Sequence, residues 1–251
     1  MKANRKYIVI VCLALIVGVG SFQYVSHLVT VSSNVNGREL PIYSVETTEK
    51  KVAISFDAAW GNEDVYKILG ILKQYDVKAT FFMTGDWVSK YSDEVKAIYE
   101  AGHDLGNHGE NHKNMSQLSI EEQKAEIMDA HKRVKELVGV EMELFRPPYG
   151  DYNDDLILNA MDCGYYTVQW DVDSLDWKDY GVDSIIDTVV NHDNLQNGSI
   201  ILCHNGTKYT AEALENMIIG LQEKGYEMVP VSELIYKDNY HMDVTGRQIK
   251  D

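Results

Sequence analysis

Five clusters of reactive side chains stand out in the sequence, and each one follows a short apolar run. The clusters are Ser55-Phe56-Asp57, Asn107 to His112, Arg146 to Gly150, Asp173 to Trp177, and Leu202-Cys203-His204. Carboxylates and histidines often transfer protons in catalysis, and histidines also bind transition metals. Because all five clusters hold the same position relative to an apolar run, they predict one active site at one end of a sheet.

Two histidines of this set have a spacing suited to metal binding. His108 and His112 are four residues apart. That spacing brings both imidazoles to one metal ion if the segment is a helical turn or a tight loop.

The other reactive residues also have structural interpretations when each is taken alone. Asp57 could cap a helix, and Arg146 could form a structural ion pair. His204 could be a satisfied core histidine, and Trp177 could simply belong to the core. Because five clusters occupy equivalent positions, an active site is a better explanation than five separate structural roles.

The segments that must position these clusters alternate in type along the chain. Candidate strands are Val52–Asp57, Lys78–Met83, His103–Asn107, Glu143–Arg146, Tyr165–Trp170, Ser199–His204 and Glu227–Val231. Candidate helices are Glu63–Gln74, Ser92–Ala101, Ser119–Val138, Asn153–Cys163, Val182–Leu195 and Ala211–Lys224. Ser119 and Glu122 have the spacing of a capping box, and Gly139 is a suitable helix end.

Repeated β-α units predict an α/β fold with a parallel sheet. We expect a distorted, incomplete (β/α) barrel of about seven parallel strands with surrounding helices, and an open doubly wound sheet is the alternative. No GxGxxG or GxxxxGK[ST] motif follows a candidate strand, so the usual nucleotide-binding folds lack their phosphate loops here.

The N-terminus predicts export. Lys2, Arg5 and Lys6 precede an apolar run, Tyr7 to Phe22, a pattern typical of a signal peptide or a single membrane anchor over residues 1–30. We expect an extracytoplasmic protein that is membrane-anchored by residues 7–29 or secreted after cleavage before Ser21. A buried core helix is the third alternative. Residues 31–48 are expected to be a stalk, 49–237 the catalytic domain and 238–251 a polar tail.

The amino-acid composition excludes some classes of binding partner and metal site. The 251 residues include 23 Lys and Arg against 39 Asp and Glu, a net charge of −16, so we expect no nucleic acid partner. Three cysteines, Cys12, Cys163 and Cys203, exclude a disulfide framework and a cysteine-only zinc site. No obligate protein partner is evident.

The five ordered clusters resemble the motifs of the polysaccharide deacetylases, carbohydrate esterase family 4, over residues 49–236. Ser55-Phe56-Asp57 is similar to the family's Thr-Phe-Asp-Asp-Gly, and His108 to His112 is similar to His-Ser/Thr-x-x-His. The other three clusters are similar to the third, fourth and fifth motifs. Pro41-Ile42-Tyr43, Phe56 to Gly61 and Pro230 to Leu234 further resemble a sporulation-associated subgroup.

The resemblance implies removal of N-acetyl groups from cell-wall glycan, peptidoglycan or a related polysaccharide, during sporulation. It implies that His108 and His112 hold a divalent metal, with zinc the first candidate, which polarises the acetyl oxygen and the attacking water. It makes Asp57 the general base and His204 the general acid.

The remaining implied roles support these groups. Arg146 would keep Asp57 ionised and oriented, and Asp176 would raise the pKa of His204. The backbone N–H of Tyr149 would stabilise the oxyanion. Trp177 and Leu202 would form walls of the acetyl pocket.

The sequence departs from the family pattern at the metal. Ala58 stands where the family has its metal-binding Asp, and Gly109 replaces the Ser or Thr after the first histidine. Glu110 and Asp64 are candidates to supply the missing carboxylate. The departure predicts weakly held metal and motivates an alternative, a catalytically silent glycan-binding or scaffold protein. Metal-dependent hydrolysis of another amide or ester is a third possibility.

Overall fold

The structure is a computed structural model that describes residues 31–251. Residues 1–30, and with them the predicted signal peptide or anchor, lie outside the described residues. From residue 31 onward, none of the helices is both long enough and apolar enough to cross a membrane.

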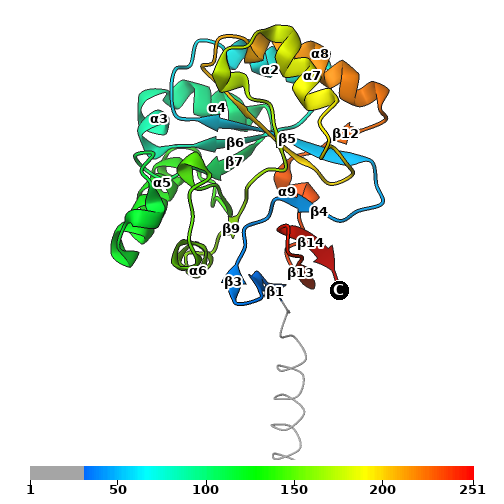
Figure 1. The fold of residues 1–251 in the computed structure, drawn as a ribbon. Coiled ribbons are helices and arrows are strands. Elements are labelled where there is room, and N and C mark those ends of the chain that lie inside the picture. The colour runs from blue at the N-terminus through cyan, green and yellow to red at the C-terminus, as the bar shows by residue number, and fades with distance from the viewer. Residues whose placement is uncertain (1–30) are drawn as a thin grey trace, which may run out of the picture.

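The main sheet is parallel and forms an incomplete barrel, as predicted (Figure 1). Its strands are β5 (Lys51–Ala58), β6 (Thr80–Met83), β7 (Asp104–Asn107), β8 (Leu144–Phe145), β9 (Tyr166–Thr167), β10 (Val172–Asp173), β11 (Ile200–His204) and β12 (Glu227–Met228). The order is β10-β11-β5-β6-β7-β8-β9, and β12 pairs with β5. Because the described strands β9 and β10 do not pair, the barrel is incomplete.

Helices cover the outside of this sheet (Figure 1). They are α2 (Val65–Gln74), α3 (Gly85–Lys90), α4 (Ser92–Glu100), α5 (Ile120–Val138), α6 (Asp154–Asp162), α7 (Val182–Val190) and α8 (Thr210–Glu223). The short α9 (Val231–Leu234) instead packs against Ala53 and Phe82 on the inner face of the sheet. Around the outside, α7, α8, α2, α4, α5 and α6 each pack against the next. The short α3 and β10 were not predicted.

Strand alternation in β5 places the first reactive cluster. Ile54 and Phe56 belong to the apolar cluster that packs under the helices, and Phe56 stacks on Phe81 with ring centroids 5.0 Å apart. Because successive side chains point to opposite faces of a strand, Ser55 and Asp57 face the interior of the barrel. The apolar run therefore determines on which face the carboxylate emerges.

The predicted capping box of α5 is present. The Ser119 hydroxyl accepts from the Glu122 backbone N–H, and the Glu122 carboxylate accepts from the Ser119 N–H. The helix ends at Gly139, whose φ of +77° is left-handed, a conformation that favours glycine.

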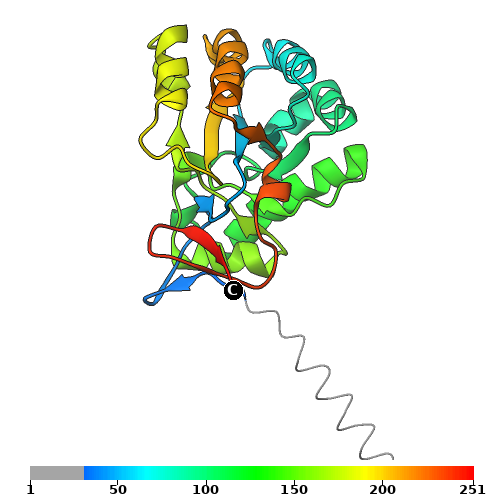
Figure 2. The ribbon, with the colours of Figure 1, turned by 90° about the vertical axis from the view of Figure 1, so that its right-hand side faces the viewer.

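The two segments expected to be a stalk and a tail are instead joined in one sheet. Its strands are β1 (Val31–Ser32), β13 (Tyr240–Met242), β14 (Arg247–Lys250) and β4 (Ser44–Val45), in that order. The short strands β2 (Asn34–Val35) and β3 (Arg38–Glu39) form a separate pair. Figure 2 shows the C-terminal strands against the N-terminal segment.

Buried side chains explain this pairing. Tyr240 and Met242 are buried on either side of the exposed His241, which is the alternation of a strand with one covered face. Gln248 is fully buried and exchanges two hydrogen bonds with the backbone of Tyr236, at 2.8 and 2.9 Å. Residues 31–48 and 238–251 are thus part of the folded body.

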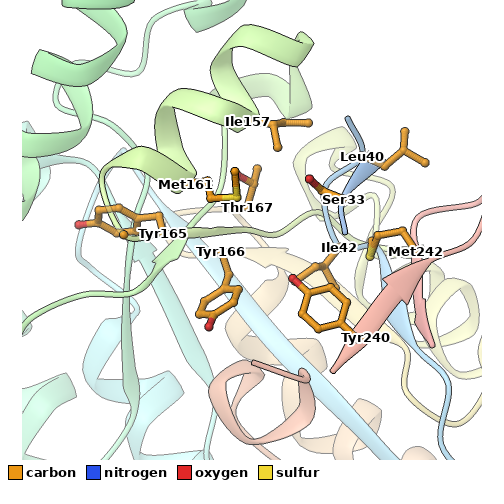
Figure 3. Close-up of a pocket in the computed structure, with 11 residues that line it drawn as sticks. Ser33, Leu40, Ile42, Ile157, Met161, Tyr165, Tyr166, Thr167, Tyr240 and Met242 are labelled. Atoms are coloured by element: carbon orange, nitrogen blue, oxygen red, sulfur yellow. The ribbon is translucent and has the colours of Figure 1, made fainter. Parts of the chain in front are cut away.

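A small apolar cavity lies where this sheet meets α6 and β9 (Figure 3). Its volume is about 280 Å³, and its lining includes Ile42, Met161, Tyr166, Tyr240 and Met242. None of the residues predicted to act in catalysis or metal binding lines it.

We expect deletion of residues 238–251 to destabilise the protein strongly. Loss of a large buried apolar side chain costs roughly 2–5 kcal/mol, and for a protein of this size each kcal/mol changes Tm by about 2–4 °C. Because Tyr240 and Met242 are both lost, Tm in a thermal scan should fall by about 10 °C or more. The control is Val244→Ser, at a side chain that is 73% exposed. A deletion that leaves Tm within about 2 °C would restore the reading of this segment as a tail.

Candidate active site

The carboxyl ends of β5, β7, β8 and β11 meet around a cavity of about 830 Å³. Seven of the predicted site residues line it: Asp57, His108, His112, Tyr149, Trp177, Leu202 and His204. The remaining two, Arg146 and Asp176, are fully buried behind it. Since β11 pairs with β5 so that His204 stands opposite Asp57, sheet register brings the two proposed proton-transfer groups together.

Asp57 forms a buried ion pair with Arg146. Arg146 Nη1 donates to Asp57 Oδ1 at 2.7 Å and to Ser55 Oγ at 2.9 Å, and Nη2 donates to the Gln169 carbonyl at 3.1 Å. Burial by itself raises the pKa of Asp57, but the charges of Arg146 and the neighbouring histidines outweigh it and hold the pKa below its usual value. Asp57 is therefore ionised at neutral pH.

His204 is held by Asp176. His204 Nδ1 lies 2.7 Å from Asp176 Oδ1, and Asp176 Oδ2 accepts from the His204 N–H at 2.7 Å and from the Thr210 hydroxyl at 2.6 Å. Burial alone lowers the pKa of His204, but the hydrogen bond and charge of Asp176 raise it above its usual value. With Nδ1 bound to Asp176, Nε2 is the atom left for a ligand in the cavity.

The two candidate metal ligands lie on a tight loop rather than a helical turn. His112 has a left-handed φ of +54°, and its ring is 4.9 Å from that of His108, centroid to centroid. Burial lowers the pKa of both histidines, that of His112 to about 4 with the help of His108. Both imidazoles are neutral at physiological pH, which is the form that binds metals.

Glu126 of α5 holds this loop in place. Its buried carboxylate accepts from the backbone N–H groups of Glu110 and Asn111, at 3.0 and 2.8 Å, and from the Asn111 side chain at 2.9 Å. Gly109 has a φ of +74°, a left-handed conformation that favours glycine. The departure from Ser or Thr at this position therefore has a backbone reason.

The donor atoms fit a divalent metal, although the set is incomplete. A carbonyl only accepts, so His108 Nδ1 donates to the Arg146 carbonyl at 2.7 Å and Nε2 carries the lone pair. That Nε2 lies 3.5 Å from Asp57 Oδ2, and two facing lone pairs suit a cation between them. His112 Nδ1 is buried without a partner. Within residues 31–251, however, no group of three or more His, Cys, Asp or Glu is placed to hold a metal.

Neither candidate for the missing carboxylate lines the cavity. Glu110 is paired with Arg133 of α5, whose Nε donates at 2.7 Å. Asp64 accepts from the Gly206 backbone N–H at 2.9 Å. Ala58 itself is fully buried.

Sequence reasoning missed several contributors. Trp60 lines the cavity, but it lies three residues after Asp57, in the segment Phe56 to Gly61, which was noted only for its resemblance to a subgroup. Glu126 looks in sequence like any helix glutamate, and only its burial distinguishes it. Asn205 is buried, and its Nδ2 donates to the carbonyls of Trp60 and Gly61. The only feature of the sequence that pointed to Asn205 was its position directly after His204.

Comparison with known proteins agrees with this geometry. The polysaccharide deacetylase family model matches residues 44–168. A peptidoglycan-N-acetylglucosamine deacetylase of Bacillus cereus is 38% identical over 200 residues, which cover 77% of this chain and 92% of that protein. The uncharacterized protein YlxY of Bacillus subtilis is 36% identical over 195 residues, and the match spans 78% of this chain and 60% of YlxY.

A solved structure is also similar. BA3943 of Bacillus anthracis, a CE4 family pseudoenzyme, superposes with a TM-score of 0.75 at 33% identity, covering 83% of this chain and 70% of that one. A mutant of BA3943 has restored enzymatic activity. This chain therefore belongs to the polysaccharide deacetylase family, whose deacetylases are generally metal-dependent.

We expect Asp176→Asn to lower the pKa of His204. Burial lowers the pKa of His204, and the negative charge of Asp176 is the main factor that raises it. Without that charge, burial disfavours the imidazolium. NMR titration of the His204 imidazole measures the effect directly. The matched control is Asp179→Asn, because Asp179 lines the same cavity and is not hydrogen-bonded to His204, whose carboxylate partner is Asp176. An unchanged pKa in Asp176→Asn would show that Asp176 does not control this histidine.

We expect Ala58→Asp to tighten Zn²⁺ binding by about tenfold or more, since even indirect partners of a metal contribute roughly 10–100-fold. Isothermal titration of the wild type and the variant measures it. Ala59→Asp adds the same carboxylate one residue away, at a partly exposed position, and should not tighten binding.

Two results would contradict the expectation. Equal and tight binding in the wild type and Ala58→Asp would mean that another group completes the metal site. Equal and undetectable binding would mean that His108 and His112 are not a metal pair.

Proposed function

We propose that this protein hydrolyses N-acetyl groups from cell-wall glycan. The proposal is carried by one observation: an ionised carboxylate and a histidine that favours its protonated form face the same cavity. Asp57 has a lowered pKa and His204 a raised pKa, and they stand opposite each other on β5 and β11. Amide hydrolysis needs both a base for water and an acid for the leaving amine.

In this mechanism Asp57 takes the proton of the attacking water, and Arg146 keeps the carboxylate ionised and in one orientation. His204 then donates its Nε2 proton to the departing amine, while Asp176 holds Nδ1 and favours the protonated ring. A divalent metal held by His108 and His112 would supply Lewis-acid polarisation.

The other assigned residues shape the cavity around the acetyl group. Tyr149 sits in a left-handed turn with φ +63°, and we assign its backbone N–H to the oxyanion. Leu202 is buried and Trp177 exposed on the lining of the cavity, and we assign both to the acetyl pocket.

We assign the substrate to peptidoglycan by analogy with the relatives. The Bacillus cereus relative is a peptidoglycan-N-acetylglucosamine deacetylase, and another, PdaC of Bacillus subtilis, is a peptidoglycan-N-acetylmuramic acid deacetylase. The basic and apolar N-terminal segment supports an extracytoplasmic location, anchored by residues 7–29 or secreted. The subgroup resemblance supports a role in sporulation. We assign zinc as the metal, because zinc commonly binds imidazole nitrogens.

A second candidate function is a catalytically silent glycan-binding protein. Ala58 favours it, together with the incomplete donor set among residues 31–251 and the likeness to a CE4 pseudoenzyme. Mass spectrometry of purified wall glycan incubated with the protein separates the two functions, because only an enzyme removes acetyl mass.

We expect Asp57→Asn and His204→Ala each to lower acetate release from wall glycan by roughly 10²–10⁴-fold, since neither replacement transfers a proton. Asp57→Asn also leaves Arg146 buried without a counter-charge, so circular dichroism and Tm must accompany the assay. His204→Ala leaves that ion pair intact and tests the mechanism independently.

Matched controls are Asp155→Asn and His241→Ala, both at exposed positions. A folded Asp57→Asn or His204→Ala protein that keeps more than about half of wild-type activity would contradict the assigned role, because general acid or base catalysis is worth about a hundredfold or more.

A further inference from the structure

The small apolar cavity beside α6 has no role in the proposed mechanism. Its volume is about 280 Å³, and none of the described residues that line it is charged, although Asp, Glu, Lys and Arg make up 25% of the whole chain. An apolar cavity of about 150 Å³ stays free of water and takes up benzene. This cavity therefore has room for a longer apolar group.

The apolar cavity opens to the protein surface on α6. Met161 lines it and is 48% exposed, and the neighbouring Leu158 is 38% exposed. Figure 3 shows that the lining side chains come from α6, from the N-terminal segment and from β13. Large apolar side chains that stay exposed around an opening indicate a surface that binds an apolar partner.

The lining also includes a buried hydroxyl without a hydrogen-bond partner. Thr167 lines the cavity and is 6% exposed, and its Oγ1 is buried and unpaired. An unpaired buried hydroxyl is unfavourable, and a carbonyl oxygen can accept its proton. The lining therefore suits a ligand that combines an apolar chain with a carbonyl group.

The apolar cavity lies where the N-terminal segment enters the fold. Strand β1 pairs with β13 so that Val31 stands opposite Tyr240, and both Tyr240 and Ser33 line the cavity. The predicted anchor ends at residue 29, four residues before Ser33. Since a chain spans at most about 3.3–3.6 Å per residue, Ser33 lies within about 14 Å of the end of that anchor. Figure 1 shows β1, β13 and α6 together at the end of the molecule away from α2, α7 and α8.

An anchored protein therefore holds the apolar cavity beside the lipid headgroups, because the headgroup layer adds only about 5–8 Å on each side of the hydrocarbon core. An acyl chain that moves from the bilayer into an apolar cavity exchanges one apolar environment for another, so the transfer costs little. Tethering keeps the local concentration of lipid high. Charge attraction does not contribute, since the chain has a net charge of −16 and the membrane surface is anionic.

We propose that the apolar cavity binds the acyl chain of a membrane lipid, whose ester carbonyl accepts a hydrogen bond from Thr167. The inference rests on the anchored location given under the proposed function and not on the deacetylase activity. It gives the protein a membrane contact in addition to its anchor. Two contacts restrain how the folded body turns on the membrane, and with it the direction in which the active site faces.

The test uses the full-length chain reconstituted in vesicles of phosphatidylcholine, a zwitterionic lipid that avoids charge repulsion. A fraction of the lipid carries a photoreactive diazirine in its acyl chain, and mass spectrometry locates the adducts after irradiation. We expect adducts on residues 7–29 and, within the folded body, on the lining of the apolar cavity, above all on Met161 and Met242. We expect none around Met128 of α5, which is 41% exposed.

Met161→Glu places a carboxylate at the opening of the cavity. Because a charged group is strongly disfavoured in apolar surroundings, the cavity adducts should fall by about tenfold or more. Met161→Leu keeps the lining apolar and should keep the adducts. Thr167→Val removes the donor but not the shape, and should lower the adducts by about twofold or more. The matched control is Met128→Glu, at a side chain that does not line the cavity. Thermal scans confirm that each variant is folded.

Adducts on residues 7–29 alone would overturn the inference, because the bilayer is then within reach and the cavity takes up no lipid. Cavity adducts that persist in Met161→Glu, or that fall equally in Met128→Glu, would overturn it as well. Unchanged adducts in Thr167→Val would overturn the assigned hydrogen bond. A protein without adducts on residues 7–29 or in the cavity would refute the anchored location and this inference with it.

Acetate release from wall glycan by the same vesicles is measured in parallel. Met161 does not line the active-site cavity, so Met161→Glu should leave acetate release unchanged. Cavity adducts that depend on Met161, without acetate release, would support the lipid site and refute the proposed enzyme. Acetate release with adducts on residues 7–29 alone would refute the lipid site and leave the enzyme standing.

Discussion

The buried ion pair between Arg146 and Asp57 is the constraint around which the rest of the site is arranged. A guanidinium and a carboxylate removed from water are tolerated only when their geometry is good and their remaining hydrogen-bonding groups are satisfied. Ser55 and the Gln169 carbonyl accept from the two terminal nitrogens of the guanidinium, its Nε is buried without a partner, and its Cζ lies 4.1 Å from the Phe82 ring centroid. The ends of several strands must therefore stay in register for this pair to persist.

The same arrangement separates the protonation states of the groups that face the cavity. The positive charge of Arg146 holds Asp57 ionised, and the negative charge of Asp176 favours the protonated form of His204. The Arg146 carbonyl meanwhile fixes the Nδ1 proton of His108. Arg146 thus keeps the Asp57 carboxylate ionised with its side chain and fixes the tautomer of His108 with its backbone carbonyl. The proposed base and one proposed metal ligand therefore depend on the same residue.

Sequence reasoning succeeded where a pattern was long or local. Strand β5 was predictable because Val52 to Phe56 is a mainly apolar run, as expected for a strand that is buried on both faces, and the ends of parallel strands necessarily meet at one edge of the sheet. Strands β1 and β13 were not predictable, because two or three residues of alternation resemble a loop and their pairing joins Val31 to Tyr240. Trp60 and Glu126 were missed for a related reason, since exposure toward a cavity and burial within a helix are properties of the fold.

Ala58 shows that catalytic competence and structural integrity are separable in this protein. Two pairs form within the chain itself, Asp57 with Arg146 and His204 with Asp176. The loop that carries His108 and His112 is held by Glu126. None of these contacts involves a carboxylate at position 58. A chain that loses this carboxylate can therefore keep the whole proton-transfer set in place, so an active member and a silent member of the family can differ at one buried side chain beside an otherwise unchanged site.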